Sequence, residues 1–176
     1  MFRPMTRDDL GLLSIWLAAP HVEPWWREDA SPEAIEARYG PALDGGDPTE
    51  HFIVERDGAP VGMTQRYLNN DDPEWAAALA PTGSPVDSAG IDYLIGHPAL
   101  IGHGLGADMI GRFVADTWVR YPDTSAIVVT VSTENRRSWR ALEKAGFERT
   151  WTGEIRSGDP SDTGISHCYA LARPVS

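Results

Sequence analysis

A chain of 176 residues, 41% of them hydrophobic and seven of them tryptophan, is long enough to bury a substantial core, which excludes a disordered protein. The formal net charge of −11 disfavours nucleic acid, which needs a basic surface, and favours a cationic partner, although acidity that only aids solubility is an open alternative. The single cysteine, Cys168, excludes an internal disulfide framework and indicates a reducing cytoplasm. No apolar run approaches membrane-spanning length, so we expect no membrane segment.

Apolar periodicity and capping residues predict the elements of the N-terminal half. These are a strand at 2–5, helices at about 6–20 and 31–39, and strands at 51–55 and 60–68 joined by a turn at 56–58. Residues 21–29 are expected to form a loop in which Trp25 and Trp26 are either core anchors or an aromatic wall facing a substrate.

Residues 69–87 are rich in Asn, Asp and Pro and are long for a connecting loop, which indicates a functional or mobile segment. Its acidic residues are candidates to line an entrance for an amine, with a solvated acidic loop as the alternative; they are Asp71, Asp72, Glu74 and Asp87.

The C-terminal half predicts alternating strands and helices. These are a strand at 90–95, a glycine-rich turn at 101–106, a helix at 107–120, a strand at 125–132, a helix from Asn135 to Gly146, and an antiparallel pair at 148–155 and 166–173 around an acidic loop at 157–163. We see no internal repeat, so we expect a single α/β domain over residues 1–176 with a mixed sheet.

The glycine-rich turn is the first feature that carries chemistry. Gly102, Gly104 and Gly106 let the backbone approach a ligand closely, and free N–H groups at the start of the next helix favour an anion such as a phosphate. The turn lacks the Lys and Ser or Thr of a P-loop, because Ala107 and Asp108 follow it, and it is too short for a dinucleotide fingerprint. Taken alone, it is equally consistent with an ordinary loop before a helix.

A second segment makes the pattern more specific. The G-x-G-x-G turn, the strand after it, Asn135 and the run Glu143–Phe147 together resemble the GNAT superfamily of acetyl-CoA-dependent N-acyltransferases. Within that family, the chain looks most like the aminoglycoside 6′-N-acetyltransferases, which confer antibiotic resistance. The segments that carry this closer resemblance are 22–26, 62–67, 90–92 and 143–149.

The resemblance implies a GNAT fold, in which a central mixed sheet is flanked by helices and two parallel strands, 90–95 and 125–132, splay apart around acetyl-CoA. The pyrophosphate is then expected on the amides of the glycine turn and the pantetheine arm along the first of these strands. The cofactor-binding residues implied are Tyr93, Leu94, Ile95, Gly102, His103, Gly104, Leu105, Gly106 and Asn135.

The reaction implied is direct attack of a neutral amine on a thioester in a ternary complex, which needs no covalent enzyme intermediate. By resemblance, Asp92 is the active-site aspartate, although an ordinary Asp is a poor base at neutral pH and therefore chiefly binds the amine. A salt-bridged structural Asp is the alternative. The substrate-binding residues implied are Glu23, Trp25, Trp26, Gln65, Tyr67, Glu74, Trp75 and Asp92.

Three positions depart from the family pattern. Ile101 replaces a polar residue at the head of the turn, Leu142 replaces a tyrosine that protonates the leaving thiolate, and Thr130 stands where these enzymes have a second aspartate. An acyltransferase for a siderophore lysine, another metabolite or a protein amine therefore stays open, as does a non-catalytic acyl-CoA sensor. The five histidines show no metal spacing, so we expect no metal. A cytoplasmic monomer or homodimer is expected.

Overall fold

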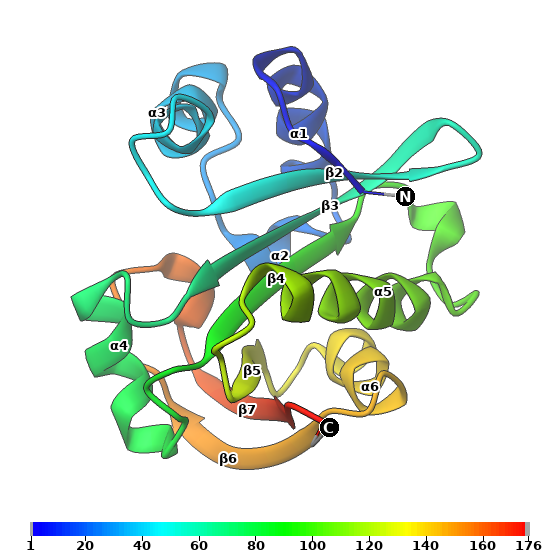
Figure 1. Ribbon diagram of the computed structural model, residues 1–176. Helices are drawn as coiled ribbons and strands as arrows, with labels where there is room; N and C mark the ends of the chain where they lie inside the picture. Colours follow the sequence, from blue (N-terminus) through cyan, green and yellow to red (C-terminus); the bar gives the residue numbers. More distant parts are fainter. Residues whose placement is uncertain (1, 175–176) are drawn as a thin grey trace.

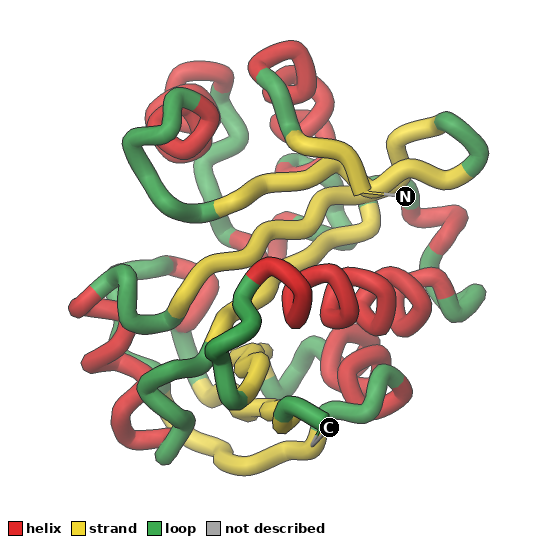
Figure 2. Tube along the Cα trace, viewed as in Figure 1, coloured by secondary structure: helices red, strands yellow, loops and turns green. Residues whose placement is uncertain are grey.

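The computed structural model describes residues 2–174 and is organised by a seven-stranded sheet in the order β1-β2-β3-β4-β5-β7-β6 (Figures 1 and 2). Every neighbouring pair is antiparallel except β4 and β5, which are parallel. The strands are β1 (Phe2–Pro4), β2 (Glu50–Arg56), β3 (Ala59–Leu68), β4 (Ala89–Ile95), β5 (Ala126–Ser132), β6 (Glu148–Glu154) and β7 (Ile165–Ala172).

Helices cover both faces of this sheet (Figure 1). They are α1 (Leu10–Leu17), α2 (Glu23–Trp26), α3 (Pro32–Leu43), α4 (Pro73–Leu79), α5 (Leu105–Arg120) and α6 (Arg136–Lys144), with 3-10 turns η1 (Arg7–Asp9), η2 (Ala80–Thr82), η3 (Pro98–Leu100) and η4 (Pro160–Asp162). On one face, α1 and α3 pack on Ile53, Met63 and Leu94. On the other face, α5 and α6 pack on Ile91 and Ile127 in a separate apolar cluster.

The parallel pair at the centre of the sheet separates after two residues. Ala89 pairs with Ile127 and Gly90 with Val128, and no further pair joins β4 to β5. On its other side β4 stays in register with β3 as far as the pair Gly62–Ile95. The expected mixed sheet with splayed parallel strands is therefore confirmed, and a wedge opens between the carboxyl-terminal ends of β4 and β5.

Two segments expected to be loops contain helices. α2 lies inside 21–29, where Pro24 occupies the first turn. α4 lies inside 69–87, where the Asp72 side chain accepts hydrogen bonds from the backbone N–H groups of Glu74 and Trp75. An Asp followed by Pro at the first helical position is a strong N-terminal signal, and the Asn, Asp and Pro content around it obscured that signal.

Two other helices are longer than expected. α3 continues from the predicted end at Tyr39 to Leu43, with Pro41 inside it. α5 begins at Leu105, within the expected glycine turn, because Gly104 adopts a φ of 83° at its N-cap and releases the chain directly into the helix. The first amides of α5 therefore belong to the turn itself.

Candidate active site

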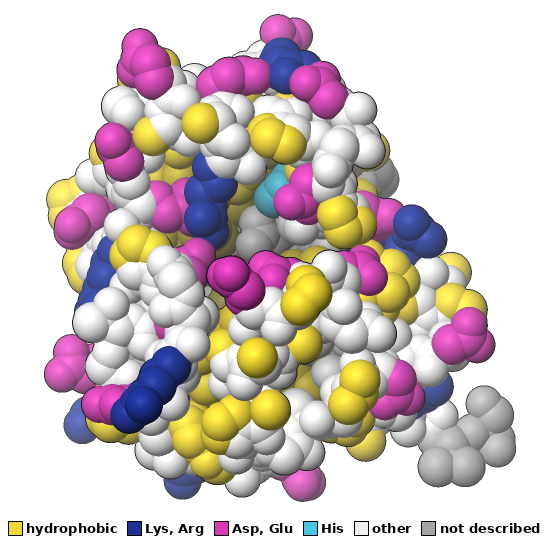
Figure 3. Space-filling model, turned by 90° about the vertical axis from the view of Figure 1, so that its left-hand side faces the viewer, with side chains coloured by type: hydrophobic (Ala, Val, Ile, Leu, Met, Phe, Trp, Pro, Cys, Tyr) yellow, Lys and Arg dark blue, Asp and Glu magenta, His cyan; other side chains and the backbone are white. Residues whose placement is uncertain are grey.

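Two cavities meet at the wedge between β4 and β5. One, here called the acidic cavity, has a volume of about 710 Å³, and the other, the glycine-turn cavity, has a volume of about 500 Å³. They share Trp25, Trp26, Tyr93, Asn135 and Ser138 in their walls. In Figure 3, Asp and Glu side chains surround a hollow on one face of the molecule. The carboxylates that line the acidic cavity are Glu28, Asp47, Asp71, Asp72, Glu74, Asp92, Asp159 and Asp162.

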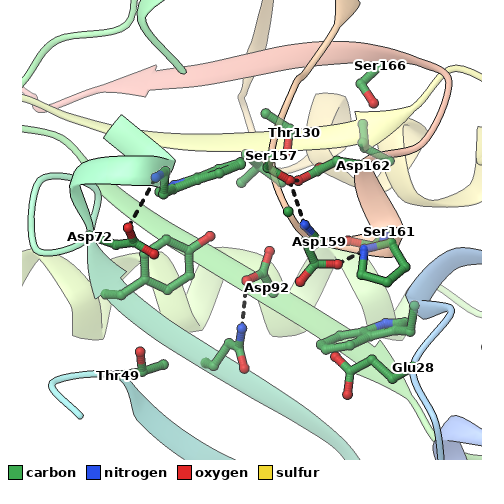
Figure 4. A pocket seen from close by; sticks show the side chains of 18 of the residues that line it. Glu28, Thr49, Asp72, Asp92, Thr130, Ser157, Asp159, Ser161, Asp162 and Ser166 are labelled. Atoms are coloured by element: carbon green, nitrogen blue, oxygen red, sulfur yellow. Dashed lines mark hydrogen bonds between the residues drawn. The ribbon is translucent and has the colours of Figure 1, made fainter. Parts of the chain in front are cut away.

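Asp92 lies in the wall of the acidic cavity, on the face of β4 that carries α1 and α3. Its register partner on β3 is Gln65, whose Nε2 donates a hydrogen bond to Asp92 Oδ2 at 2.8 Å (Figure 4). Burial raises the pKa of Asp92 above its ordinary value, and hydrogen bonds from Gln65 and Tyr67 oppose that rise. The pKa of the Tyr67 hydroxyl is itself raised, by burial and by the charge of Asp92. These partners hold the carboxylate in a fixed place while its burial makes it more basic.

The loop before β7 brings two more carboxylates into the same cavity. Asp162 accepts a hydrogen bond from Ser157 Oγ at 2.5 Å, and burial raises its pKa to about 6, with the charges of Asp159 and Asp92 adding to the rise. Burial also acts on Asp159, but hydrogen bonds from Ser161 and the charge of Arg38 outweigh it and lower the pKa of Asp159. Figure 4 shows both residues beside Thr130 and Asp92. Asp159, at the N-cap of η4, and Asp162, within η4, therefore lie near Thr130. Thr130 is the position at which the enzymes that the sequence resembles have a second aspartate.

The glycine turn and β4 bring backbone groups to the glycine-turn cavity. Gly102 and Gly104 have φ values of +87° and +83°, and a Cβ at either position would meet no atom within 4 Å. The amide of Gly96 donates to the carbonyl of Val61 on β3, so alternation directs the backbone groups of Tyr93 and Ile95 toward the wedge. An anion fits against the turn and the start of α5, and an extended amide-containing chain fits along β4.

A basic face of α6 closes the glycine-turn cavity. Arg136, Arg137, Arg140 and Lys144 all line it, and Glu134 is the acid beside them. None of these four basic residues is among those predicted from the sequence to bind the cofactor. Their signal was visible, because Arg136, Arg140 and Lys144 recur every four residues and therefore share one face of a helix. The net charge of −11 repels a polyanion, and the local positive charge of this helix face offsets that repulsion at the cavity.

Most of the residues expected to bind a substrate meet in the acidic cavity. Its walls include Trp25, Trp26, Gln65, Tyr67, Glu74, Trp75 and Asp92, together with Asp71 and Asp72. Glu23 is exposed on α2 and lines neither cavity. Asp87 also lies outside both walls and accepts a hydrogen bond from Ser125.

Most of the residues expected to bind the cofactor line the glycine-turn cavity. They are Tyr93, Leu94, Ile95, Gly102, Gly104, Gly106 and Asn135. His103 is exposed and lies outside the wall, whereas Leu105 packs against the apolar cluster of Val61 and Met109. Asn135 caps α6, because its side chain accepts a hydrogen bond from the Ser138 amide at 3.2 Å.

The three departures from the family pattern fall in different places. Ile101 lines the glycine-turn cavity and Thr130 the acidic cavity. Leu142 is 0% exposed within the cluster under α6, so it contributes packing where a tyrosine was expected. Tyr93, whose hydroxyl lies 2.8 Å from Ser138 Oγ, stands at the junction of the cavities, and burial raises its pKa.

Among residues 2–174, none of the helices has the length and apolar content that a membrane-spanning segment requires. No group of three His, Cys, Asp or Glu side chains in the same range is arranged to hold a metal ion.

Comparisons with known proteins agree with this geometry. A family model described as an acetyltransferase (GNAT) domain matches residues 5–155. Two relatives named aminoglycoside N(6′)-acetyltransferase type 1, from Klebsiella pneumoniae and Serratia marcescens, are each 32% identical over 155 residues, or 85% of this chain and 74% of theirs. A crystal structure of the aminoglycoside acetyltransferase AAC(6′)-Ib with coenzyme A matches with a TM-score of 0.82 and 26% identity, covering 98% of this chain and 94% of that one. A second, with coenzyme A and kanamycin, matches with a TM-score of 0.81 and 27% identity over the same shares.

Proposed function

The chain belongs to the GNAT acetyltransferase family, and on that premise we propose that it transfers an acetyl group from acetyl-CoA to an aminoglycoside antibiotic. The acceptor atom in this proposal is the 6′-amine, the position named in the relatives from Klebsiella pneumoniae and Serratia marcescens. Acetylation removes a positive charge and a hydrogen-bond donor from the drug, so the proposed biological outcome is resistance.

The glycine-turn cavity fits acetyl-CoA, which supplies the acetyl thioester. The amides at Gly102–Gly106 are suited to its pyrophosphate, and the backbone groups of Tyr93 and Ile95 that face the wedge are suited to its amide-containing arm. Arg140 and Lys144 add positive charge for its phosphates. The AAC(6′)-Ib structures with coenzyme A support this assignment.

The acidic cavity fits a polycationic acceptor. Its carboxylates attract ammonium groups, and the indoles of Trp25, Trp26 and Trp75 offer apolar and cation–π surfaces to a charged sugar ring. The volume of about 710 Å³ suits a molecule of several rings. The AAC(6′)-Ib structure with kanamycin supports an aminoglycoside as that molecule.

Asp92 is the residue we assign to the proton that the reacting ammonium must lose. In the transfer, the ammonium first gives one proton to Asp92, directly or through a water, and the neutral nitrogen then bonds to the acetyl carbon while the carbon–sulfur bond breaks. The second proton that this nitrogen loses passes through water to the coenzyme A thiolate, which leaves as the free thiol. Burial makes this carboxylate a better acceptor than an exposed Asp, while Gln65 keeps its orientation. The neighbouring acids Asp159 and Asp162 hold the cationic acceptor.

The observation that carries the proposal is the shared wall of the two cavities. Tyr93, Asn135 and Ser138 line both, so a thioester on one side and an amine on the other can meet without a covalent enzyme intermediate. Acetyl-CoA is a cytoplasmic metabolite, so the proposal places the enzyme in the cytoplasm. A monomer or homodimer remains our prediction, which size-exclusion chromatography with light scattering tests.

The test is a thiol-release assay with acetyl-CoA and a panel of kanamycin, ribostamycin, spermidine and a lysine peptide. We expect turnover with the aminoglycosides and a product whose acetyl group NMR places on the 6′-nitrogen. If the enzyme acetylates spermidine or the peptide but neither aminoglycoside, the proposed acceptor is wrong and another amine is the substrate. Binding of acetyl-CoA with no turnover on any acceptor would support a sensor.

A further inference from the structure

Arg38 on α3 places a fixed positive charge in the wall of the acidic cavity. Among the described residues that line this cavity, it is the only Lys or Arg. Its Nε lies 2.9 Å from Glu28 Oε1 and an amino group of its guanidinium lies 2.7 Å from Asp159 Oδ2, so the side chain joins the α2–α3 segment to η4. Its side chain is 46% exposed, so a ligand in the cavity can approach it.

The two carboxylates bound by Arg38 differ in accessibility. Glu28 is 6% exposed, and its other oxygen accepts a hydrogen bond from the Tyr39 hydroxyl at 2.9 Å. Asp159 is 27% exposed and extends into the cavity (Figure 4), where its remaining oxygen accepts from the Ser161 amide. An incoming ammonium can therefore reach Asp159 more readily than Glu28.

We propose that Arg38 determines acceptor specificity by acting as an internal cation that competes with the acceptor's ammonium groups for Asp159. This inference rests on the proposed function, because it takes the acidic cavity as the acceptor site. The guanidinium holds both carboxylates through two different nitrogens, because its donors form a rigid planar fork. The competition weakens binding of highly charged acceptors more than binding of monoamines. Each further ammonium group is either repelled by the charge of Arg38 or finds a carboxylate that Arg38 already occupies.

A purely structural role for Arg38, holding the η4 loop in place, has less support. The loop carries its own hydrogen bonds, from Ser157 to Asp162 at 2.5 Å and from the Thr163 hydroxyl to the Pro160 carbonyl at 2.9 Å. Arg27 also donates to the Thr163 carbonyl at 3.2 Å. A partly exposed ion pair adds little to such a scaffold.

The experiment measures the Kd of kanamycin and of glucosamine, a sugar monoamine, by titration calorimetry with the wild-type chain and with Arg38→Gln. We expect the Kd of kanamycin to fall about two- to fivefold in R38Q, the size of a partly exposed ion pair, and that of glucosamine to change less. The gain should shrink at high salt. In an Asp159→Asn background, the same substitution should have a smaller effect on the Kd of kanamycin, because no carboxylate remains at position 159 to compete for.

Arg38→Lys is the second variant, because a lysine keeps the charge but has one nitrogen in place of the two guanidinium nitrogens that contact Glu28 and Asp159. We expect its kanamycin affinity to lie between those of the wild type and R38Q, and thermal unfolding checks that both variants fold. Unchanged or weaker kanamycin binding in R38Q, or equal changes for kanamycin and glucosamine, overturns the inference. Because binding is measured without turnover, a wild-type chain that binds kanamycin but does not acetylate it refutes the proposed function alone.

Discussion

The side-chain amide of Gln65 donates to the carboxylate of Asp92 at 2.8 Å across a register pair of β3 and β4. Because cross-strand pairs in an antiparallel ladder keep a fixed separation, the backbone itself sets the position of this hydrogen bond. Burial raises the pKa of Asp92, and the Gln65 donor lowers it. The two residues together therefore set the pH at which the proposed proton acceptor is charged.

Gln65→Leu should move the acid limb of the pH profile to higher pH. The substitution removes a donor that favours the ionised carboxylate, so the pKa of Asp92 rises further and the charged form of Asp92 is populated only at higher pH. A hydrogen bond to a charged group corresponds to a shift of about one pH unit in kcat/KM. Thr64→Val is the matched control, because Thr64 is buried on the same strand and its hydroxyl has no partner among the described residues. If the acid limb of Q65L lies at the same pH as that of the wild type, the ionisation of Asp92 does not determine this limb.

Asp92→Asn should lower kcat by about a hundredfold, the usual contribution of a positioned acid or base. The amide keeps the shape of the side chain but cannot accept the proton or attract the ammonium. Asp87→Asn is the control, since that carboxylate lines neither cavity. Steady-state kinetics with acetyl-CoA and kanamycin measures both variants. Near wild-type turnover in D92N would leave Asp92 with a structural role only.

The basic face of α6 should affect the KM for acetyl-CoA and not the KM for the acceptor. Replacing Arg140 and Lys144 together by alanine removes two charges from the glycine-turn cavity, so we expect the KM for acetyl-CoA to rise about five- to tenfold. Raising the salt concentration should narrow the difference from wild type. Arg112→Ala is the control, because Arg112 pairs with Asp108 on the outer surface of α5. If KM for kanamycin rises instead, these residues serve the acceptor.

Local patterns account for what the sequence predicted well. The glycine turn, the acid in strand β4 and the helix that ends at Gly146 each depend on residues close together in the chain, and each lies where expected. The sequence did not predict α4, because the Asn, Asp and Pro residues around it are typical of a loop and obscure the capping signal of Asp72.

The rest of the site depends on tertiary convergence. Glu28 and Asp159 are 131 residues apart in the numbering, yet both contact one guanidinium, that of Arg38. No spacing rule for a single sequence joins such positions. The acidic loop was recognised as a loop at 157–163, but its approach to Thr130 follows from how β7 pairs with β5.

The acids of the η4 loop should have opposite effects on stability. The folded pKa of Asp162 is raised to about 6 from an ordinary value of 3.8, so its contribution to stability is full below pH 4 and is lost as pH rises toward 6. Asp162→Asn should therefore increase the free energy of unfolding at pH 7 by about 1–2 kcal/mol, and the gain should vanish near pH 4. Asp159→Asn is the matched control with the opposite sign, because the pKa of Asp159 is lowered and its charge stabilises the fold at pH 7. Urea unfolding of both variants at pH 4 and pH 7 measures the difference. A carboxylate that serves to bind a cationic acceptor is expected to lower the stability of the free protein. If D162N is less stable than the wild type at pH 7, Asp162 instead stabilises the fold through favourable contacts, and this expectation is wrong.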